Sequence, residues 1–166
     1  MNLHTLNTLG CEQAHEVFFN CCSAERWTQL MIDSRPFSNQ ADMLQHAKNH
    51  WAAMQESDWL EAFAGHPKIG DVNSLKEKYA ATRGLAGHEQ SSVSAADDLV
   101  IEKLAHHNAE YEKIHGFIFI VFATGKSAEQ MLALLMDRIH NTRLQELHNA
   151  AAEQLKITLL RLDKIQ

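Results

Sequence analysis

Two prolines and seven glycines are the only strong helix-breaking residues in this chain of 166 residues. So few breakers favour long helices and leave few turn signals for a sheet of many short strands. The apolar residues support this interpretation. Between Ser94 and His115 they recur at intervals of three and four, as on one face of an amphipathic helix, and the same spacing returns between Thr142 and Leu162. The sequence therefore predicts an all-α fold.

Helix-start signals predict the shorter helices. Ser127 opens the sequence SAEQ, in which Gln130 follows three residues later as in a capping box. Asn39 or Ser38 is expected to cap one helix, and Ser57 another. The expected ranges are 39–54, 57–63, about 74–81 and, within 11–33, two helices of which the second begins near Ala24.

The sequence GFIFIVFATG, at residues 116–125, breaks the helical pattern. It is a β-prone apolar run bounded by glycines, and periodicity alone cannot separate a buried strand from a buried helical turn. No other part of the chain reads as a strand that could pair with it. We therefore expect a single-domain helical bundle over 1–166, in which this run is a buried segment that is irregular or starts a helix.

Composition and charge exclude several classes of protein. A formal net charge of −6 argues against nucleic-acid binding, which needs a basic surface. No apolar run is long enough to span a membrane, and the N-terminal sequence does not resemble a secretory signal. Cys11, Cys21 and Cys22 form no CxxC motif, and the adjacent Cys21 and Cys22 are interpreted as buried apolar thiols rather than a redox pair. The sequence therefore predicts a cytoplasmic protein with no nucleic-acid or membrane partner.

The sequence AGHPKIG, from Ala64 to Gly70, carries the strongest chemical signal. His66 stands directly before Pro67, and a residue in that position is kept out of the helical region, so the preceding apolar helix must end near the imidazole. A helix end favours the protonated imidazole, whereas burial opposes the charge. Because histidine exchanges protons near neutral pH, His66 is a candidate catalytic acid or base. The alternative is a surface histidine at a helix end.

The sequence GHEQS, from Gly87 to Ser91, supplies a second group of polar side chains. Glu89 accepts hydrogen bonds, and Gln90 both donates and accepts them, which suits the N–H and C=O groups of a urea or an imide. The alternative is a first helical turn with polar side chains facing solvent. With His66, Glu89 is a candidate acid–base pair.

Of three arginines considered, one is a candidate for binding an anion and two are interpreted as structural. Arg161 lies among leucines near the C-terminus, where it either extends to water or binds an anion. Arg35 and Arg138 are interpreted as structural residues that form salt bridges or cap helices.

No motif for a metal or an organic cofactor is complete. His46 and His50 are four residues apart, which puts two imidazoles on one helical face, but no HExxH, CxxC or paired carboxylate completes a ligand set. The motifs GxGxxG, GxxxxGK[ST] and GxSxG are missing, which leaves no signal for a nucleotide, a flavin or a serine nucleophile. Any catalysis is therefore expected to rest on acid–base and electrostatic groups, without metal or cofactor.

In their order and spacing, the motifs of this chain resemble those of the OHCU decarboxylase family, which acts on 2-oxo-4-hydroxy-4-carboxy-5-ureidoimidazoline in urate degradation. The matching pieces are LN at 6–7, RPF at 35–37, HPKIG at 66–70, EQ at 89–90, HGFIFIVFATGKS at 115–127, RIHN at 138–141 and RL at 161–162. They span nearly the whole chain. One departure is Ala86, where the family often has serine, so one side-chain contact in the site is expected to be lost.

The resemblance implies an all-helical carboxy-lyase of purine metabolism, commonly a homodimer, that forms (S)-allantoin from this small-molecule substrate without a metal or a cofactor. It implies that His66 and Glu89 are catalytic. The substrate-binding positions that it implies are Pro67, Ala86, Gln90, Ile118, Phe119, Ile120, Val121 and Arg161. The segment 116–125 would then be a wall of the site.

Other functions stay open on the residues alone. A related helical enzyme would use the same acid–base pair on another ureide or cyclic imide. A non-enzymatic helical module would use the two loops to bind a partner, and a histidine-rich metal protein is a third alternative. In an enzyme, His66 and Glu89 would converge in one cleft, whereas in a binding module they would lie apart on an open surface.

Overall fold

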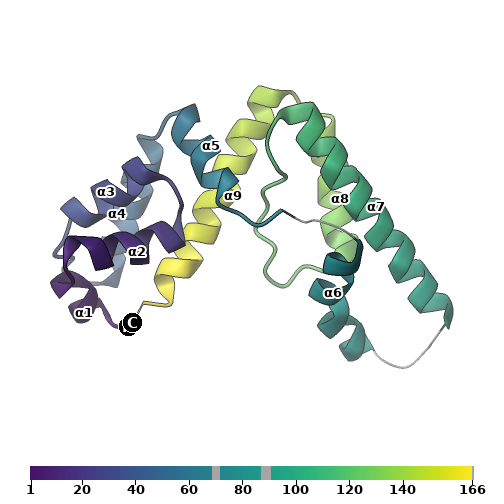
Figure 1. Ribbon diagram of the computed structural model, residues 1–166, viewed down its shortest axis with the longest axis horizontal. Coiled ribbons are helices and arrows are strands. Elements are labelled where there is room, and N and C mark those ends of the chain that lie inside the picture. Colours follow the sequence, from purple (N-terminus) through teal and green to yellow (C-terminus); the bar gives the residue numbers. More distant parts are fainter. Residues whose placement is uncertain (69–71, 87–90, 166) are drawn as a thin grey trace. The chain divides into compact units, whose positions relative to one another are not determined.

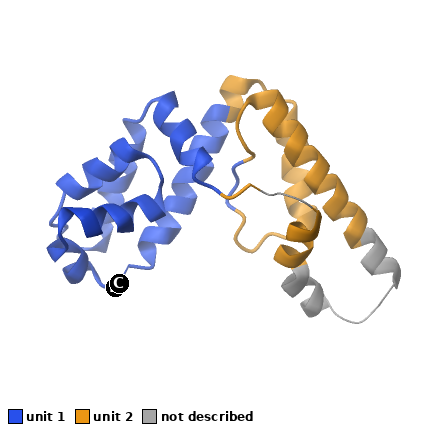
Figure 2. Ribbon diagram, in the orientation of Figure 1, with its two compact units in different colours: residues 1–66, 120–122, 147–166 blue, residues 67–119, 123–146 orange. Residues whose placement is uncertain are grey.

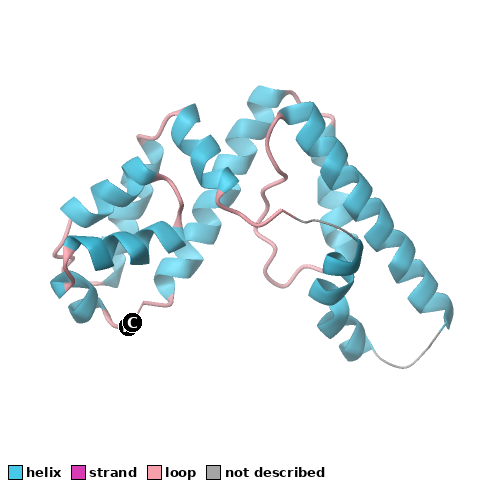
Figure 3. Ribbon diagram, viewed as in Figure 1, coloured by secondary structure: helices cyan, strands magenta, loops and turns pink. Residues whose placement is uncertain are grey.

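The computed structural model describes the backbone of residues 1–68, 72–86 and 91–165, and the side chains of 1–68, 72–79 and 97–165. These residues form helices joined by loops, and no strand occurs among them (Figure 1, Figure 3). The helices are α1 (Leu3–Thr8), α2 (Cys11–Cys21), α3 (Glu25–Asp33), α4 (Gln40–Ala52), α5 (Glu56–Ala64), α6 (Val72–Ala86), α7 (Ser91–His115), α8 (Ala128–Ile139) and α9 (Arg143–Asp163). The prediction of an all-α fold is confirmed. Over the same described residues, no helix is both long and apolar enough to cross a bilayer.

Side-chain caps begin two helices where the sequence predicts them. The Asn39 side chain accepts a hydrogen bond of 2.9 Å from the Asp42 N–H at the start of α4. Ser127 and Gln130 form a capping box before α8, in which each side chain bonds the backbone of the other residue. Both caps pair backbone N–H groups that would otherwise lack a partner within the helix.

The Ser127 cap gives a testable contribution to stability. Ser127→Ala is expected to lower the free energy of unfolding by about 1 kcal/mol, because the Gln130 N–H loses its acceptor. Urea unfolding followed by far-ultraviolet circular dichroism measures this change. The control is Thr124→Ala in the preceding exposed loop, which is expected to stay within about 0.5 kcal/mol of the parent protein. Equal losses in both variants would contradict the role of the cap.

Several helices differ from the predictions in their ends or in their presence. The predicted cap at Ser57 is wrong, because α5 begins after Gln55, which forms a capping box with Asp58. Helix α6 is longer than the predicted 74–81 at both ends. Helix α1 has no counterpart among the predicted helices. It has only 6 residues, too few for a periodic pattern, and Asn2 caps it through the Thr5 N–H at 2.8 Å.

The chain divides into two compact units, each made of several stretches of sequence (Figure 2). Unit 1 comprises 1–66, 120–122 and 147–166, and unit 2 comprises 67–119 and 123–146. Helix α9 thus contributes its first turn to unit 2 and the rest to unit 1. That 1–166 acts as one domain stays a prediction.

Aromatic side chains fill the core of unit 1. The Phe18 ring meets Trp27 and Phe37 edge to face, with centroids 6.3 Å and 6.2 Å apart. The indole N–H of Trp51 donates to the Ala151 carbonyl at 2.9 Å, which ties α4 to α9. Every one of these aromatic rings is buried.

The LN and RPF motifs hold each other within unit 1. The Asn7 amide donates to the Phe37 carbonyl and accepts from the Phe37 N–H, each at 2.9 Å. Arg35 donates to the Leu6 and Leu9 carbonyls, both at 2.8 Å, at the C-terminal end of α1. The prediction of Arg35 as a structural, helix-capping arginine is confirmed.

A buried ionic network holds α7, α8 and α9 together in unit 2. The carboxylate of Glu146 is fully buried and accepts hydrogen bonds from Tyr111 Oη at 2.6 Å, Arg138 Nε at 2.8 Å and Asn141 Nδ2 at 3.0 Å. Burial, together with the hydrogen bond to Glu146 and its charge, holds the pKa of Tyr111 well above its usual range, so the phenol stays a donor. Arg138 is therefore the structural arginine that the sequence predicts.

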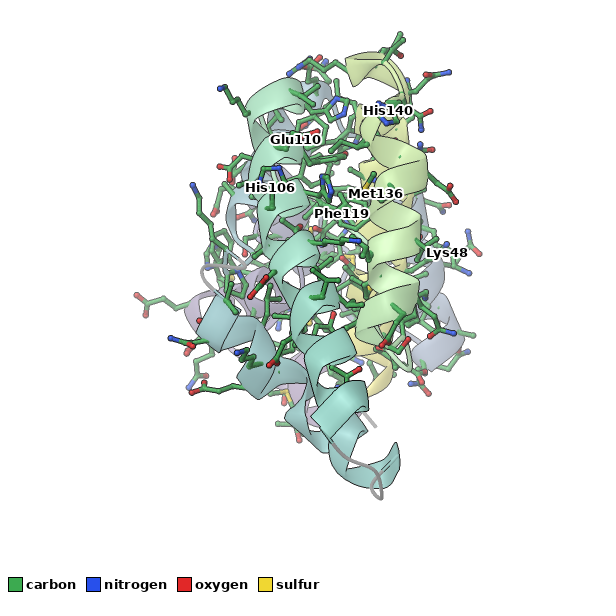
Figure 4. All side chains as sticks on the ribbon, turned by 90° about the vertical axis from the view of Figure 1, so that its right-hand side faces the viewer. Lys48, His106, Glu110, Phe119, Met136 and His140 are labelled. Atoms are coloured by element: carbon green, nitrogen blue, oxygen red, sulfur yellow. The ribbon has the colours of Figure 1, made fainter. Side chains whose placement is uncertain are left out.

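The GFIFIVFATG segment is irregular and largely buried, as predicted. Gly116 and Gly125 have φ values of +81° and +76°, a left-handed conformation that favours glycine. The Phe119 ring packs edge to face on Tyr111 with centroids 5.2 Å apart, and the Arg138 guanidinium lies 4.6 Å from its centre. Figure 4 shows Phe119 between α7 and α8. Two glycine turns thus allow an apolar run to enter the core without forming a helix.

Candidate active site

His66 follows the C-terminal end of α5 in unit 1. The helix ends at Ala64, Gly65 is its C-cap, and the His66 N–H bonds the Phe63 carbonyl at 3.2 Å. A Cβ atom on Gly65 would lie 2.5 Å from the Ser23 side chain, so no larger residue fits without a shift. The chain therefore turns out of α5 in a fixed place, with the half-buried imidazole next in sequence.

The imidazole of His66 has one hydrogen-bond partner in the described part of unit 1. Its Nε2 lies 2.6 Å from Oε1 of Gln154, a residue of α9 that is only 1% exposed. The amide of Gln154 also bonds Thr158. Sequence reasoning missed Gln154, because a lone glutamine in a helix gives no signal of its partner 88 positions away.

His66 is shifted toward its neutral form. Burial lowers the pKa of its imidazole, the Gln154 hydrogen bond partly offsets this, and the positive charge of Arg161 lowers it further. The net direction is below the ordinary value of about 6.5 for histidine. Burial, one of the two effects named in the sequence analysis, is the largest cause of this shift. Near pH 7 this imidazole has a lone pair that can accept a proton.

Arg161 fixes the end of α2 and supplies positive charge to unit 1. Its guanidinium donates to the Cys21 carbonyl at 3.2 Å, and the Asn20 carbonyl lies at 3.5 Å. Guanidinium has five N–H donors, so two carbonyl contacts do not exhaust it. Part of its role is thus structural, while its charge acts on His66.

The buried cysteines are poor nucleophiles. Burial raises the pKa of Cys21 to about 11 and that of Cys22 to about 12. A thiol, rather than the reactive thiolate, therefore prevails near neutral pH. This fits their interpretation as apolar core residues.

The other predicted site residues divide between the two units and the undescribed part. Unit 1 contains Ile120, Val121 and Arg161 with His66, whereas unit 2 contains Pro67, Ile118 and Phe119. Glu89, Gln90 and the side chain of Ala86 lie outside the described residues. The assignment of these residues to one site stays a prediction.

Two groups of histidines bear on metal binding. On α4, the rings of His46 and His50 lie 5.6 Å apart, but His50 Nε2 pairs with Ser34 Oγ at 2.7 Å. On α7, ligand atoms of His106, His107 and Glu110 lie within 4.8 Å of one another, and Figure 4 shows His106 and Glu110 on this helix. The His106 side chain is 72% exposed, and its 3.6 Å contact with Glu110 is an ordinary surface ion pair. We assign no metal to either group.

Comparisons with known proteins agree with one another. The sequence profile of a family described as OHCU decarboxylase matches residues 7–163. The chain is 34% identical over 146 residues to the uric acid degradation bifunctional protein TTL of Arabidopsis thaliana, covering 87% of this chain and 45% of that protein. It is 25% identical over 166 residues to 2-oxo-4-hydroxy-4-carboxy-5-ureidoimidazoline decarboxylase of Amia calva, covering 99% and 94%. The chain thus spans less than half of the bifunctional relative but nearly all of the second.

A solved structure has the same fold. The crystal structure of OHCU decarboxylase in the presence of (S)-allantoin superimposes with a TM-score of 0.70 at 33% identity, covering 89% of this chain and 94% of that one. Fold and site thus define an all-helical protein with a half-buried, neutral imidazole at a helix end. The chain belongs to the OHCU decarboxylase family. The resemblance inferred from the motifs, and the class of enzyme that it implies, are confirmed.

Proposed function

We propose that this chain catalyses the decarboxylation of 2-oxo-4-hydroxy-4-carboxy-5-ureidoimidazoline to (S)-allantoin in urate degradation, with no metal or organic cofactor. One observation carries the proposal: His66, in a chain that matches the family over 7–163, is a half-buried imidazole whose pKa is lowered. A neutral imidazole is a proton acceptor at physiological pH, and the reaction needs one. The names of the two decarboxylase relatives support the choice of substrate.

The substrate contains its own electron sink. Decarboxylation leaves an electron pair on carbon 4, and many enzymes use a cofactor to accept it. Here the pair forms a double bond between carbon 4 and carbon 5, while the π electrons of the adjacent ring C=N bond move to its nitrogen, which takes one proton from solvent. The resulting enol then loses its 4-hydroxyl proton and gains a proton at carbon 5, which gives allantoin. Each CO2 released thus consumes one proton, and the protein has only to orient the carboxylate and move protons.

The residues of this chain have distinct roles in the proposal. His66 accepts the proton of the 4-hydroxyl and returns it to one face of carbon 5, which makes the product a single enantiomer. Glu89 holds the ureido N–H groups, and Arg161 offsets the negative charge that develops as CO2 leaves. The remaining substrate contacts are proposed for Pro67, Ala86, Gln90 and the backbone of 118–121. Ala86 removes one side-chain contact that serine would supply.

Release of CO2 from freshly prepared substrate tests the proposal. We expect protein treated with a chelator to release one CO2 per substrate, much faster than the spontaneous decay. Allantoin, hydantoin and dihydrouracil serve as alternative ureide and imide substrates, and none of them is expected to react. No acceleration, a loss of activity with the chelator, or faster turnover of an alternative substrate would each overturn it.

We also infer a homodimer that works in the cytoplasm. The dimer rests on the resemblance to the family, and the cytoplasm on the cysteines, since Cys11, Cys21 and Cys22 are all free thiols as in a reducing compartment. Light scattering coupled to size-exclusion chromatography is expected to give twice the chain mass of 18.8 kDa. A monomer at micromolar concentration would contradict the dimer.

A further inference from the structure

The hydrogen bond between His66 and Gln154 identifies which nitrogen of the imidazole carries its proton. His66 Nε2 and Gln154 Oε1 lie 2.6 Å apart. A carbonyl oxygen has no hydrogen to donate, so the ring nitrogen must be the donor. A neutral imidazole has one N–H, and in this pair it is on Nε2. The lone pair is then on Nδ1.

The orientation of the Gln154 amide is itself fixed. Its Nε2 donates to Thr158 Oγ1 at 3.2 Å, while that hydroxyl donates its own hydrogen to the main-chain carbonyl of Gln154 at 2.9 Å. With its hydrogen on that main-chain carbonyl, Thr158 accepts from the amide. A rotated amide would bring its oxygen against a hydroxyl whose hydrogen is already used. Both side chains are buried, 1% and 2% exposed, and lie one turn apart on α9, so water does not replace these bonds.

An amide is a suitable partner for an imidazole that must stay neutral. A carboxylate in the same position would also accept the Nε2 hydrogen, but its charge would stabilise the imidazolium and raise the pKa. Gln154 accepts the hydrogen without a net charge. Arg161, also on α9, is the charged group that acts on His66 in the described part of the chain, and it disfavours the cation.

We propose that Gln154, locked by Thr158, is a positioning residue that holds His66 as its Nε2–H tautomer and leaves Nδ1 as the proton acceptor. That Nδ1 accepts the proton of the substrate's 4-hydroxyl rests on the proposed function, whereas the assignment of the tautomer does not. No hydrogen-bond partner of Nδ1 occurs among the described residues, so this atom is available to a substrate.

Two-bond proton–nitrogen correlation spectra of the full chain with 15N-labelled histidine read the tautomer directly. The chain has 11 histidines, and the resonances of His66 are those lost in the His66→Asn variant. At pH 8 we expect the pattern of a pure Nε2–H tautomer. A pattern of Nδ1–H, or of both tautomers in exchange, would overturn the proposal.

Substitutions test whether Gln154 causes the tautomer. Gln154→Met keeps the shape but removes the acceptor. It is expected to give a mixture of tautomers and to lower kcat about 10- to 100-fold with KM changed less than about twofold, since general acid–base catalysis contributes about 100- to 10,000-fold. Gln154→Glu is expected to keep the tautomer and raise the pKa of His66. Unchanged spectra and kcat in Gln154→Met would refute the role.

Thr158 supplies a matched pair of variants in case a substitution at Gln154 prevents folding. Thr158→Val removes the hydroxyl at nearly constant volume and is expected to release the amide, which gives mixed tautomers. Thr158→Ser retains the hydroxyl and is expected to restore the pure Nε2–H pattern. The same pattern in both would refute the lock. If the tautomer is as proposed but the wild-type chain releases no CO2, the proposed function fails and the tautomer proposal stands. If the chain is active but has the other tautomer, the tautomer proposal fails and the proposed function stands.

Discussion

Replacing His66 with asparagine is expected to lower kcat for CO2 release by about 100-fold or more while the chain stays folded, because general acid–base catalysis contributes about 100- to 10,000-fold. Asparagine has similar bulk and can bond Gln154, but it does not titrate near neutral pH. The side chain is half-buried at a helix end and is not part of the core. Stopped-flow detection of CO2 and far-ultraviolet circular dichroism of the same sample measure activity and fold.

Two comparisons make the effect specific to His66. His4→Asn, on the exposed surface of α1, is expected to leave kcat within about twofold. In the wild-type chain, kcat is expected to be constant above the pKa of His66 and to fall as pH decreases through it, since protonation removes the lone pair. Burial and Arg161 hold that pKa below the ordinary value, so the fall belongs on the acid side of about 6.5. Activity that increases on acidification, or an active His66→Asn variant, would contradict the role.

Glu146→Gln is expected to lower the free energy of unfolding by about 3–5 kcal/mol, because it removes the negative member of a buried ion pair with Arg138. The carboxylate is fully buried and accepts three hydrogen bonds, and the Arg138 side chain is only 12% exposed. A glutamine side chain is the same size, but one of its two acceptor atoms becomes a donor that faces other donors. Urea unfolding measures the loss.

The matched control is the same substitution in a surface ion pair of unit 2. Glu112 lies 2.9 Å from Lys68, with side chains that are 38% and 72% exposed. Because exposed pairs contribute little, Glu112→Gln is expected to change stability by less than about 1 kcal/mol. Similar losses of unfolding free energy in the two variants would contradict the claim that burial makes the Glu146 network more stabilising than a surface ion pair.

Local signals predicted most of the helices. Ser127 with Gln130, and Asn39, mark helix starts through side-chain bonds that lie within four residues, so sequence alone contains the information. Apolar periodicity likewise predicted α9 to within one residue at each end. The apolar pattern did not predict a short helix whose end is fixed by a distant side chain. Helix α1 ends against Arg35, which is far away in the sequence.

Two apolar side chains within the periodic stretches 94–115 and 142–162 are exposed in the structure, although the pattern indicates a covered face. Ile114 in α7 is 53% exposed, and Leu144 in α9 is 64% exposed. Both lie in the terminal turn of a long helix, close to the irregular stretches that join it to the chain. Near a helix end the neighbouring elements, which sequence does not reveal, decide what is covered.

The candidate site was predicted only in part. The proline after His66 and the apolar helix before it locate an imidazole at a helix end, and the structure has it there. Gln154 and Thr158 could not be found in the same way, because their roles depend on a hydrogen bond between α9 and a residue that is far away in the sequence. Whether His66 is neutral also depends on burial and on Arg161, which are tertiary properties.

Circular dichroism of freshly oxidised urate, recorded with and without the protein, tests most directly whether this chain is a decarboxylase of this substrate. The spontaneous reaction has no preferred face and gives a racemate without a net signal. We expect the wild-type chain to produce the signal of (S)-allantoin rapidly, and His66→Asn to leave the spontaneous course unchanged. A slow, signal-free decay with the wild-type chain present would contradict the proposed function.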